Sequence, residues 1–298
     1  MRPLFTKRFF GVVLVVVLLA GGLFVFVNWR NWIRSETRLV EPPPAVEVKK
    51  PGPETRVIGQ SVAGRAITAT TYGKGKTQLV FIGGIHGGYE WNSVLLAYQF
   101  MDYLKTNPTV IPDNLKVTII PSANPDGVYK VIGQEGRFAL AEVPTTGDQA
   151  PGRFNAHTVD LNRNFDCQWQ PKSMWRGSSV DGGSAPFSEP EAAAIRDFVL
   201  INKPSAVVFW HSQAGAVYAS RCEGDILPET LAIMKAYAQA SGYPAVKSFD
   251  AYDVTGDAEG WLASIGIPAL TVELKTHQTI EWEQNLAGAK ALFKYYGL

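Results

Sequence analysis

The chain has 298 residues, of which 46% are hydrophobic and 18% charged, and its formal net charge is +1. This composition is ordinary for a globular protein and fits one large α/β domain with an appendage. The sequence has no basic stripe and no block of like charge, which argues against nucleic-acid binding.

The appendage is N-terminal. Residues 9–27 are apolar and uncharged, and they are long enough to cross a bilayer as a helix. A basic segment at 1–8 precedes them, and Trp29 and Trp32 follow as candidate interfacial anchors. We therefore expect a single-pass signal anchor at 9–27, a juxtamembrane and proline-rich linker at 28–54, and a folded domain at 55–298 outside the cytoplasm. A cleaved signal peptide is the alternative.

The chain has two cysteines, Cys167 and Cys222. They are compatible with one disulfide in an oxidising compartment and equally with two separate thiols.

Strand-like and helix-like runs alternate within the domain. Strands are expected at 66–72, 78–82, 116–120, 206–210 and 269–274, and helices at 91–105, 188–201, 228–241 and 280–296. This alternation predicts an α/β fold, with a central sheet covered by helices on both faces. Functional groups in such folds gather beyond strand ends, which is where His86, His211 and Glu273 lie. We expect these three residues to share one site.

The glycine-rich turn after the strand at 78–82 carries His86 and Glu90. Glycines let the backbone turn tightly enough to aim both side chains at one point. With His211, they make a set of two imidazoles and a carboxylate, which leaves a zinc ion one position for water. Zinc lowers the pKa of that water, and Glu273 is a further carboxylate that can move its proton.

Four motifs occur in a specific order along the domain. They are NPDG at 124–127, DLNRNF at 160–165, FSEPE at 187–191 and TVEL at 271–274. Together they make the chain resemble the zinc carboxypeptidase family, the M14 peptidases, over roughly residues 72–274. The resemblance implies a mixed central sheet with helices on both faces, and one Zn²⁺ per chain bound by His86, Glu90 and His211.

One departure from the family concerns the spacing of the first two ligands. The family has two residues between the histidine and the glutamate, whereas this chain has three, and Tyr89 stands at the expected position. We expect Glu90 to bind the metal, because tyrosine is a poor zinc ligand beside an available carboxylate. An altered or absent metal site is the alternative.

The resemblance also implies roles for residues around the metal. Glu273 resembles the catalytic glutamate, and Arg153 resembles the arginine that polarises the scissile carbonyl, with Arg137 as its alternative. Asp160 resembles the carboxylate that orients the first zinc histidine. The substrate-binding residues implied are Asn162 and Arg163, which hold the terminal carboxylate, and Tyr252, which caps the substrate.

Three further residues have ordinary structural explanations. His157 and His277 are interpreted as loop histidines, although His277 is close enough to Glu273 to support the site. We expect Glu259 to be an exposed loop glutamate. It lies where the family sets side-chain preference, so an acid there that favours a basic substrate is the alternative.

These features predict a membrane-anchored, extracytoplasmic zinc metallocarboxypeptidase. It would hydrolyse a C-terminal peptide or amide bond with zinc-activated water, and Glu273 would act as general base and then as general acid. Its substrates would be peptides with a free C-terminal carboxylate, with cell-wall peptides as one candidate class. The alternatives are a related zinc deacylase acting on N-acyl amino acids, or a non-catalytic binding domain with this fold.

Overall fold

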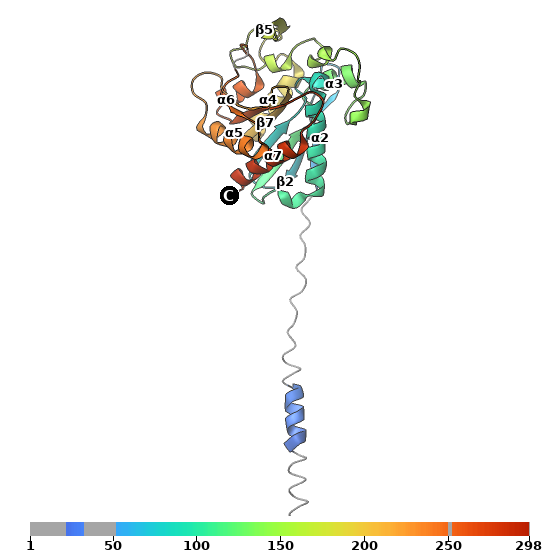
Figure 1. The fold of residues 1–298 in the computed structure, drawn as a ribbon, viewed down its shortest axis with the longest axis vertical. Helices are drawn as coiled ribbons and strands as arrows, with labels where there is room; N and C mark the ends of the chain where they lie inside the picture. Colours follow the sequence, from blue (N-terminus) through green and yellow to red (C-terminus); the bar gives the residue numbers. More distant parts are fainter. Residues whose placement is uncertain (1–21, 33–51, 250–251, 298) are drawn as a thin grey trace, which may run out of the picture. The chain divides into compact units, whose positions relative to one another are not determined.

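The computed structural model describes residues 22–32, 52–249 and 252–297. It divides into two compact units, residues 1–49 and 50–298, which are considered separately. In the first unit, residues 22–32 form a helix with exposed side chains (Figure 1). No helix in the described parts of the chain is both long and apolar enough to cross a membrane. Most of the expected span at 9–27 lies outside the described residues, as does much of the linker.

The second unit is built on one eight-stranded sheet, with strand order β1-β2-β4-β3-β7-β10-β8-β9. Its central strands β4, β3, β7 and β10 are parallel to one another. Strand β2 is antiparallel to both β1 and β4, and β8 is antiparallel to β10 but parallel to β9. The sheet is therefore mixed, as the resemblance implied. The strands are β1 (Glu54–Gln60), β2 (Ala66–Gly73), β3 (Thr77–Ile82), β4 (Leu115–Ile120), β7 (Ala206–Ser212), β8 (Val217–Ala219), β9 (Ala245–Val246) and β10 (Ala269–Leu274), and a separate hairpin comprises β5 (Lys172–Trp175) and β6 (Ser178–Asp181).

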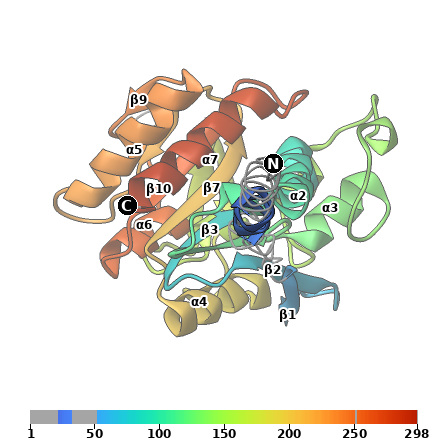
Figure 2. The same cartoon turned by 90° about the horizontal axis from the view of Figure 1, so that it is seen from below.

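Helices cover both faces of the sheet. Helices α2, α5 and α7 pack on one face, and α4 and α6 pack on the other (Figure 2). The α-helices are α2 (Trp91–Thr106), α3 (Pro125–Ile132), α4 (Pro190–Asn202), α5 (Pro228–Ser241), α6 (Ala258–Ser264) and α7 (Trp282–Tyr296). Short 3-10 turns are η1 (Gly87–Glu90), η2 (Pro108–Val110), η3 (Leu140–Glu142), η4 (Ala150–Arg153) and η5 (Leu161–Arg163).

The central strands are apolar on both faces because both faces are covered. In β7, Val208 and Trp210 point into the core with α2, α5 and α7, while Val207 and Phe209 point into the core with α4 and α6. Alternation places the next residue, His211, on the second face. The parallel register sets Glu273 of β10 beside His211. Strand geometry thus brings these two polar residues together at one edge of the apolar core.

Candidate functional site

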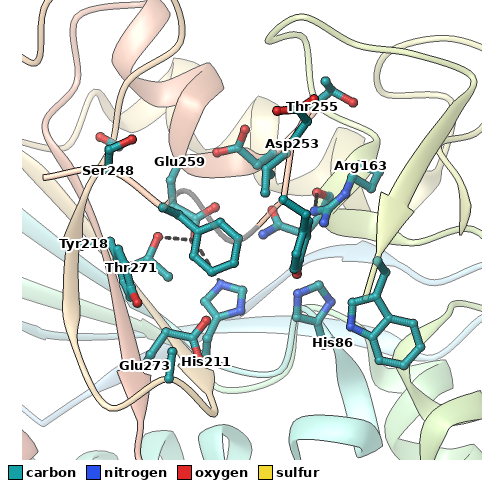
Figure 3. Close-up of a pocket in the computed structure, with 18 of the residues that line it drawn as sticks. His86, Arg163, His211, Tyr218, Ser248, Asp253, Thr255, Glu259, Thr271 and Glu273 are labelled. Atoms are coloured by element: carbon teal, nitrogen blue, oxygen red, sulfur yellow. Dashed lines mark hydrogen bonds and ion pairs between the residues drawn. The ribbon is translucent and has the colours of Figure 1, made fainter. Parts of the chain in front are cut away.

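His86, Glu90 and His211 form a buried cluster at the ends of β3 and β7. One ligand atom from each lies within 4.8 Å of the others. The two imidazole rings lie edge to face with their centroids 5.0 Å apart (Figure 3). All three side chains are at least nine-tenths buried.

The turn after His86 explains how Glu90 reaches the histidines despite the additional residue. Gly87 has φ +47°, in the left-handed region that favours glycine, and η1 begins there. The ring of Tyr89 instead packs against Trp175 and His277, with centroids 5.1 and 4.7 Å away. The structure therefore places Glu90 beside the histidines, as predicted, and directs Tyr89 elsewhere.

Asp160 lies behind His86 and is fully buried. Its Oδ1 is 3.5 Å from His86 Nδ1, and its Oδ2 accepts a hydrogen bond from Arg153 Nε at 2.8 Å. Burial alone would raise the pKa of Asp160, but the positive charge of Arg153 and the contact with His86 hold it well below its usual range. Asp160 is thus a carboxylate placed to orient His86, which is the role implied by the resemblance.

His211 lies between two carboxylates. Its Nδ1 is 3.3 Å from Glu90 Oε2, and its Nε2 is 2.9 Å from Glu259 Oε1. Glu259 also accepts a hydrogen bond from Thr271 Oγ1 at 3.0 Å (Figure 3). The expectation of an exposed loop glutamate at 259 is therefore wrong, because Glu259 is only 2% exposed. The resemblance implied that Glu259 lies near the substrate, but nothing in the sequence indicated its contact with His211.

Glu273 has the environment of a group that exchanges protons. Burial, reinforced by the nearby negative charge of Glu90, raises the pKa of Glu273 to about 7. Its Oε2 is buried and has no hydrogen-bond partner among the described residues. A carboxyl group with these properties can accept a proton and return it near neutral pH.

Arg163 is a buried cation that forms no salt bridge with any of the described residues, although the charges of Asp160 and Asp257 act on it from farther away. Its Nη1 donates to the carbonyl of Asn162 at 2.6 Å and its Nη2 to the carbonyl of Met174 at 3.1 Å, while Nε has no partner in the described part of the chain. The side chain of Asn162 accepts a hydrogen bond from the Ala258 amide at 2.9 Å. Because a buried charge is costly unless it is paired, Arg163 is suited to receive a carboxylate from a ligand.

Arg153, rather than Arg137, belongs to the site. The Arg153 guanidinium is buried, stacks 4.6 Å from the Trp175 ring, and brings Nη1 to 3.9 Å from Glu90 Oε1. Arg137 instead lies on the surface, paired with Asp102 at 2.9 Å.

A cavity of about 800 Å³ joins these groups. Except for Asp160, which lies behind His86, the predicted site residues all line it: His86, Glu90, Arg153, Asn162, Arg163, His211, Tyr252 and Glu273. Cys167 and Cys222 form a disulfide in the same wall. His277 also lines the cavity, whereas the exposed ring of His157 pairs with Glu189 at 2.8 Å.

The NPDG and FSEPE motifs support the loop that carries Arg153. Asn124 caps α3 by accepting a hydrogen bond from Gly127 N, and its amide donates to the Arg153 carbonyl at 3.2 Å. Two carboxylates of FSEPE, Glu189 and Glu191, accept hydrogen bonds from Asn155 at 2.7 and 3.2 Å. These motifs are therefore scaffolding for the site.

The residues of the cluster fit a zinc ion. Two imidazoles and one carboxylate are a common catalytic zinc set. Burial alone would lower the pKa of His211, but its contacts with Glu259 and Glu90 raise it well above the usual range. The two carboxylates thus favour positive charge at this ring, and a zinc ion bound at Nδ1, which faces Glu90 Oε2, would supply that charge in place of a proton.

Comparison with known proteins agrees with this assignment. The chain is 27% identical over 238 residues to gamma-D-glutamyl-L-diamino acid endopeptidase 1 of Lysinibacillus sphaericus, a match that covers 73% of this chain and 59% of that protein. It is 34% identical over 124 residues to human carboxypeptidase Z, covering 37% of this chain and 18% of that protein. The matches therefore span only part of the length of either relative.

Solved structures show the same fold. The carboxypeptidase A of Helicoverpa armigera superposes with a TM-score of 0.64 at 21% identity, over 82% of this chain and 69% of that one. The murein-tripeptide amidase MpaA of Escherichia coli O157 superposes with a TM-score of 0.60 at 22% identity, over 83% and 93% of the two chains.

The sequence profile of the zinc carboxypeptidase family matches residues 49–284, which is most of the chain. The match includes all three residues of the metal cluster and Glu273. This protein belongs to the zinc carboxypeptidase family, a family of metallopeptidases, and its cofactor is Zn²⁺ at the His86–Glu90–His211 group.

Proposed function

We propose that this protein is a zinc-dependent metallocarboxypeptidase that hydrolyses the peptide or amide bond next to a C-terminal residue bearing a free carboxylate. The observation that carries the proposal is Arg163, a buried cation that forms no salt bridge among the described residues and lines the cavity that holds the metal cluster and Glu273. A substrate carboxylate at Arg163 would supply the missing anion.

The predicted site residues have distinct roles in this reaction. Bound Zn²⁺ lowers the pKa of water and polarises a carbonyl. Glu273 takes a proton from the attacking water and passes it to the leaving nitrogen, so that a carboxylic acid and an amine are produced. Arg153 donates to the oxygen that gains negative charge. Asn162 and Arg163 hold the terminal carboxylate, and Tyr252 covers the substrate.

Cell-wall peptides are the substrate class that we propose. The name of the murein-tripeptide amidase supports it, because it refers to such a peptide. The gamma-D-glutamyl-L-diamino acid endopeptidase adds support, since its name refers to a bond that involves a D-amino acid. The Cys167–Cys222 disulfide supports an oxidising compartment outside the cytoplasm. A membrane anchor at residues 9–27 remains part of this proposal, and cell fractionation followed by protease treatment of intact cells tests it.

Matched peptides with a free carboxylate or a carboxamide at the C-terminus test the proposed reaction. We expect kcat/KM to fall by roughly 10–100-fold for the carboxamide, since a hydrogen-bonded charge pair at Arg163 would be lost. His86→Ala should abolish hydrolysis of both peptides. Equal kcat/KM values for the carboxylate and carboxamide peptides would refute carboxylate recognition. Activity retained in zinc-free enzyme would refute the metallopeptidase proposal.

A further inference from the structure

We propose that Glu259 is a positioning residue for the metal site, which fixes the ring of His211 so that Nδ1 is presented to the zinc ion. The inference rests on the proposed function only in that both require the metal cluster.

The hydrogen bonds at Glu259 determine where the His211 proton lies. A carboxylate only accepts hydrogen bonds, so the 2.9 Å contact between Glu259 Oε1 and His211 Nε2 requires the proton on Nε2. When the ring binds zinc it is neutral, because the ligating nitrogen must be free of its proton, and the lone pair then lies on Nδ1. That atom faces Glu90 Oε2 at 3.3 Å, which is the side of the cluster where a metal would be bound.

Glu259 is itself held firmly. Its Oε1 also accepts the hydroxyl proton of Thr271, which lies on β10 two residues before Glu273. Its backbone belongs to the first turn of α6, where Asp257 caps the helix by accepting a hydrogen bond from Gly260 N at 2.7 Å. The carboxylate can therefore hold the His211 ring in one orientation without moving itself.

The start of α6 is also tied to the predicted carboxylate-binding pair. The amide of Ala258, next to Glu259, donates to Asn162 Oδ1 at 2.9 Å. On the same helix, Trp261 packs against Phe165, with ring centroids 5.7 Å apart. One short helix thus places the carboxylate behind His211 and contacts the loop that carries Arg163.

Each of the two zinc histidines has a carboxylate behind it, at hydrogen-bond distance for His211 (2.9 Å) and at 3.5 Å for His86. Asp160 lies behind His86, and Glu259 lies behind His211. Carboxylates that accept the second N–H of a ligating histidine fix its orientation and raise its basicity, and their loss typically weakens metal binding 10–100-fold.

Glu259 has a competing role that the same substitution can test. It lines the cavity, so it is placed to bind a cationic group on the substrate. A carboxylate used in that way would change substrate preference and leave metal affinity unaltered. The two roles predict different measurements.

The experiment compares Glu259→Ala and Glu259→Gln with wild type, using Asp253→Asn as the matched control. Asp253 is an exposed acid that lines the same cavity. The Zn²⁺ dissociation constant is measured by competition with a chromophoric chelator, and the visible spectrum is recorded after Co²⁺ substitution.

We expect zinc affinity to fall roughly 10–100-fold in Glu259→Ala and less in Glu259→Gln, whose amide oxygen still accepts from Nε2. The cobalt spectrum should change with it, and Asp253→Asn should match wild type.

Unchanged zinc affinity and an unchanged cobalt spectrum in both Glu259 variants would overturn the proposal. If they were accompanied by a changed preference between lysine- and alanine-terminated peptides, Glu259 would be a specificity residue instead. Thermal unfolding of the zinc-free proteins identifies a misfolded variant, and Glu259→Gln, which keeps the side-chain volume, then carries the test. A wild-type protein that binds zinc tightly but hydrolyses no peptide would contradict the proposed function and leave this inference standing.

Discussion

Arg163 is the residue whose environment most directly suggests a ligand. Replacing it with methionine keeps much of the buried volume and removes the cation. We expect kcat/KM for peptides with a free C-terminus to fall by roughly 10–100-fold, because a charge-assisted hydrogen bond contributes about 1.5–3 kcal/mol. For peptides that end in a carboxamide, the same substitution should lower kcat/KM only slightly. The control is Arg221→Ala, which removes an exposed arginine from the same cavity and should leave kcat/KM for both kinds of peptide nearly unchanged. An equal loss for both kinds of peptide would show that Arg163 acts on the fold and not on the carboxylate.

Glu273 can be tested by a change that leaves its shape intact. Glu273→Gln keeps the side-chain volume but cannot accept the proton from water, so kcat should fall by roughly 10²–10⁴-fold. Zinc content should remain at one ion per chain, because Glu273 is not in the metal cluster. Steady-state kinetics with metal analysis of the same preparation checks both expectations. A normal kcat at full zinc content would exclude Glu273 as the base.

The sequence was sufficient to predict residues whose chemistry is carried by a motif or a strand end. His211 and Glu273 follow from their positions on buried strands, and the structure places them beside each other. The number of residues between His86 and Glu90 could not show whether Glu90 approaches the two histidines, because this depends on the backbone conformation of Gly87. The partner of Glu259 could not be predicted either. That contact joins residues 48 positions apart and depends on how α6 packs against the sheet.

At the level of elements, η1, α3 and η4 approach one another closely near the site, and each has a glycine at the contact. A Cβ on Gly127 would lie 2.2 Å from the carbonyl oxygen of Gly152, and one on Gly87 would lie 2.5 Å from the same atom. Gly127→Ala should therefore force α3 away from the η4 turn that carries Arg153. We expect it to lower the free energy of unfolding by about 1–3 kcal/mol, measured by denaturant titration. Gly52→Ala is the control, because its Cβ would meet nothing within 4 Å.

Asp126 of the NPDG motif also connects α3 to the β1–β2 turn by hydrogen bonds. This carboxylate accepts hydrogen bonds from Ser61 Oγ at 2.7 Å, Ala63 N at 3.0 Å and Arg65 Nη1 at 2.8 Å. Burial alone would raise the pKa of Asp126, but these hydrogen bonds outweigh it and lower the pKa. A lowered folded-state pKa means that the stabilisation is present above the unfolded pKa of about 4 and is lost as pH falls through the folded value.

We therefore expect Asp126→Asn to be less stable than wild type by about 1–3 kcal/mol at pH 7, with the difference shrinking as pH falls below about 4. Denaturant unfolding at several pH values measures it. Asp102→Asn removes an exposed acid paired with Arg137 and should change stability by less than about 1 kcal/mol. A stability difference for Asp126→Asn that did not depend on pH would contradict the charge-based explanation.

The long periodic elements were predictable, and the short ones were not. The helix at 228–241 and the strand at 269–274 have the predicted bounds in the structure. The structure adds β1, the β5–β6 hairpin, β8, β9, α3 and α6, which were not predicted as elements. Strand β1 is mostly exposed, so it lacks the apolar alternation by which strands are recognised. Helix α6 spans only seven residues and depends on its cap at Asp257 and on contacts with distant loops.

In the folded domain, the metal cluster lies at the carboxyl ends of the central strands β3 and β7. Its ligands follow β3 or belong to β7, strands that are paired in the middle of the sheet but far apart in sequence. The carboxylates of Glu90 and Glu259 are buried around them, and Glu273 is partly buried beside them. Zinc therefore joins distant segments of the chain and offsets a concentration of buried negative charge.

Removal of zinc should consequently lower the stability of the whole domain. A ligand present at a thousand times its dissociation constant stabilises the folded state by about 4 kcal/mol, which corresponds to roughly 10 °C in Tm for a domain of this size. We expect chelation to lower Tm by about that amount and added Zn²⁺ to restore it, as measured by calorimetry. His86→Ala should already melt near the chelated value and should not respond to zinc. If chelation removed the metal and left the Tm of wild type unchanged, metal binding would not contribute to the stability of the domain.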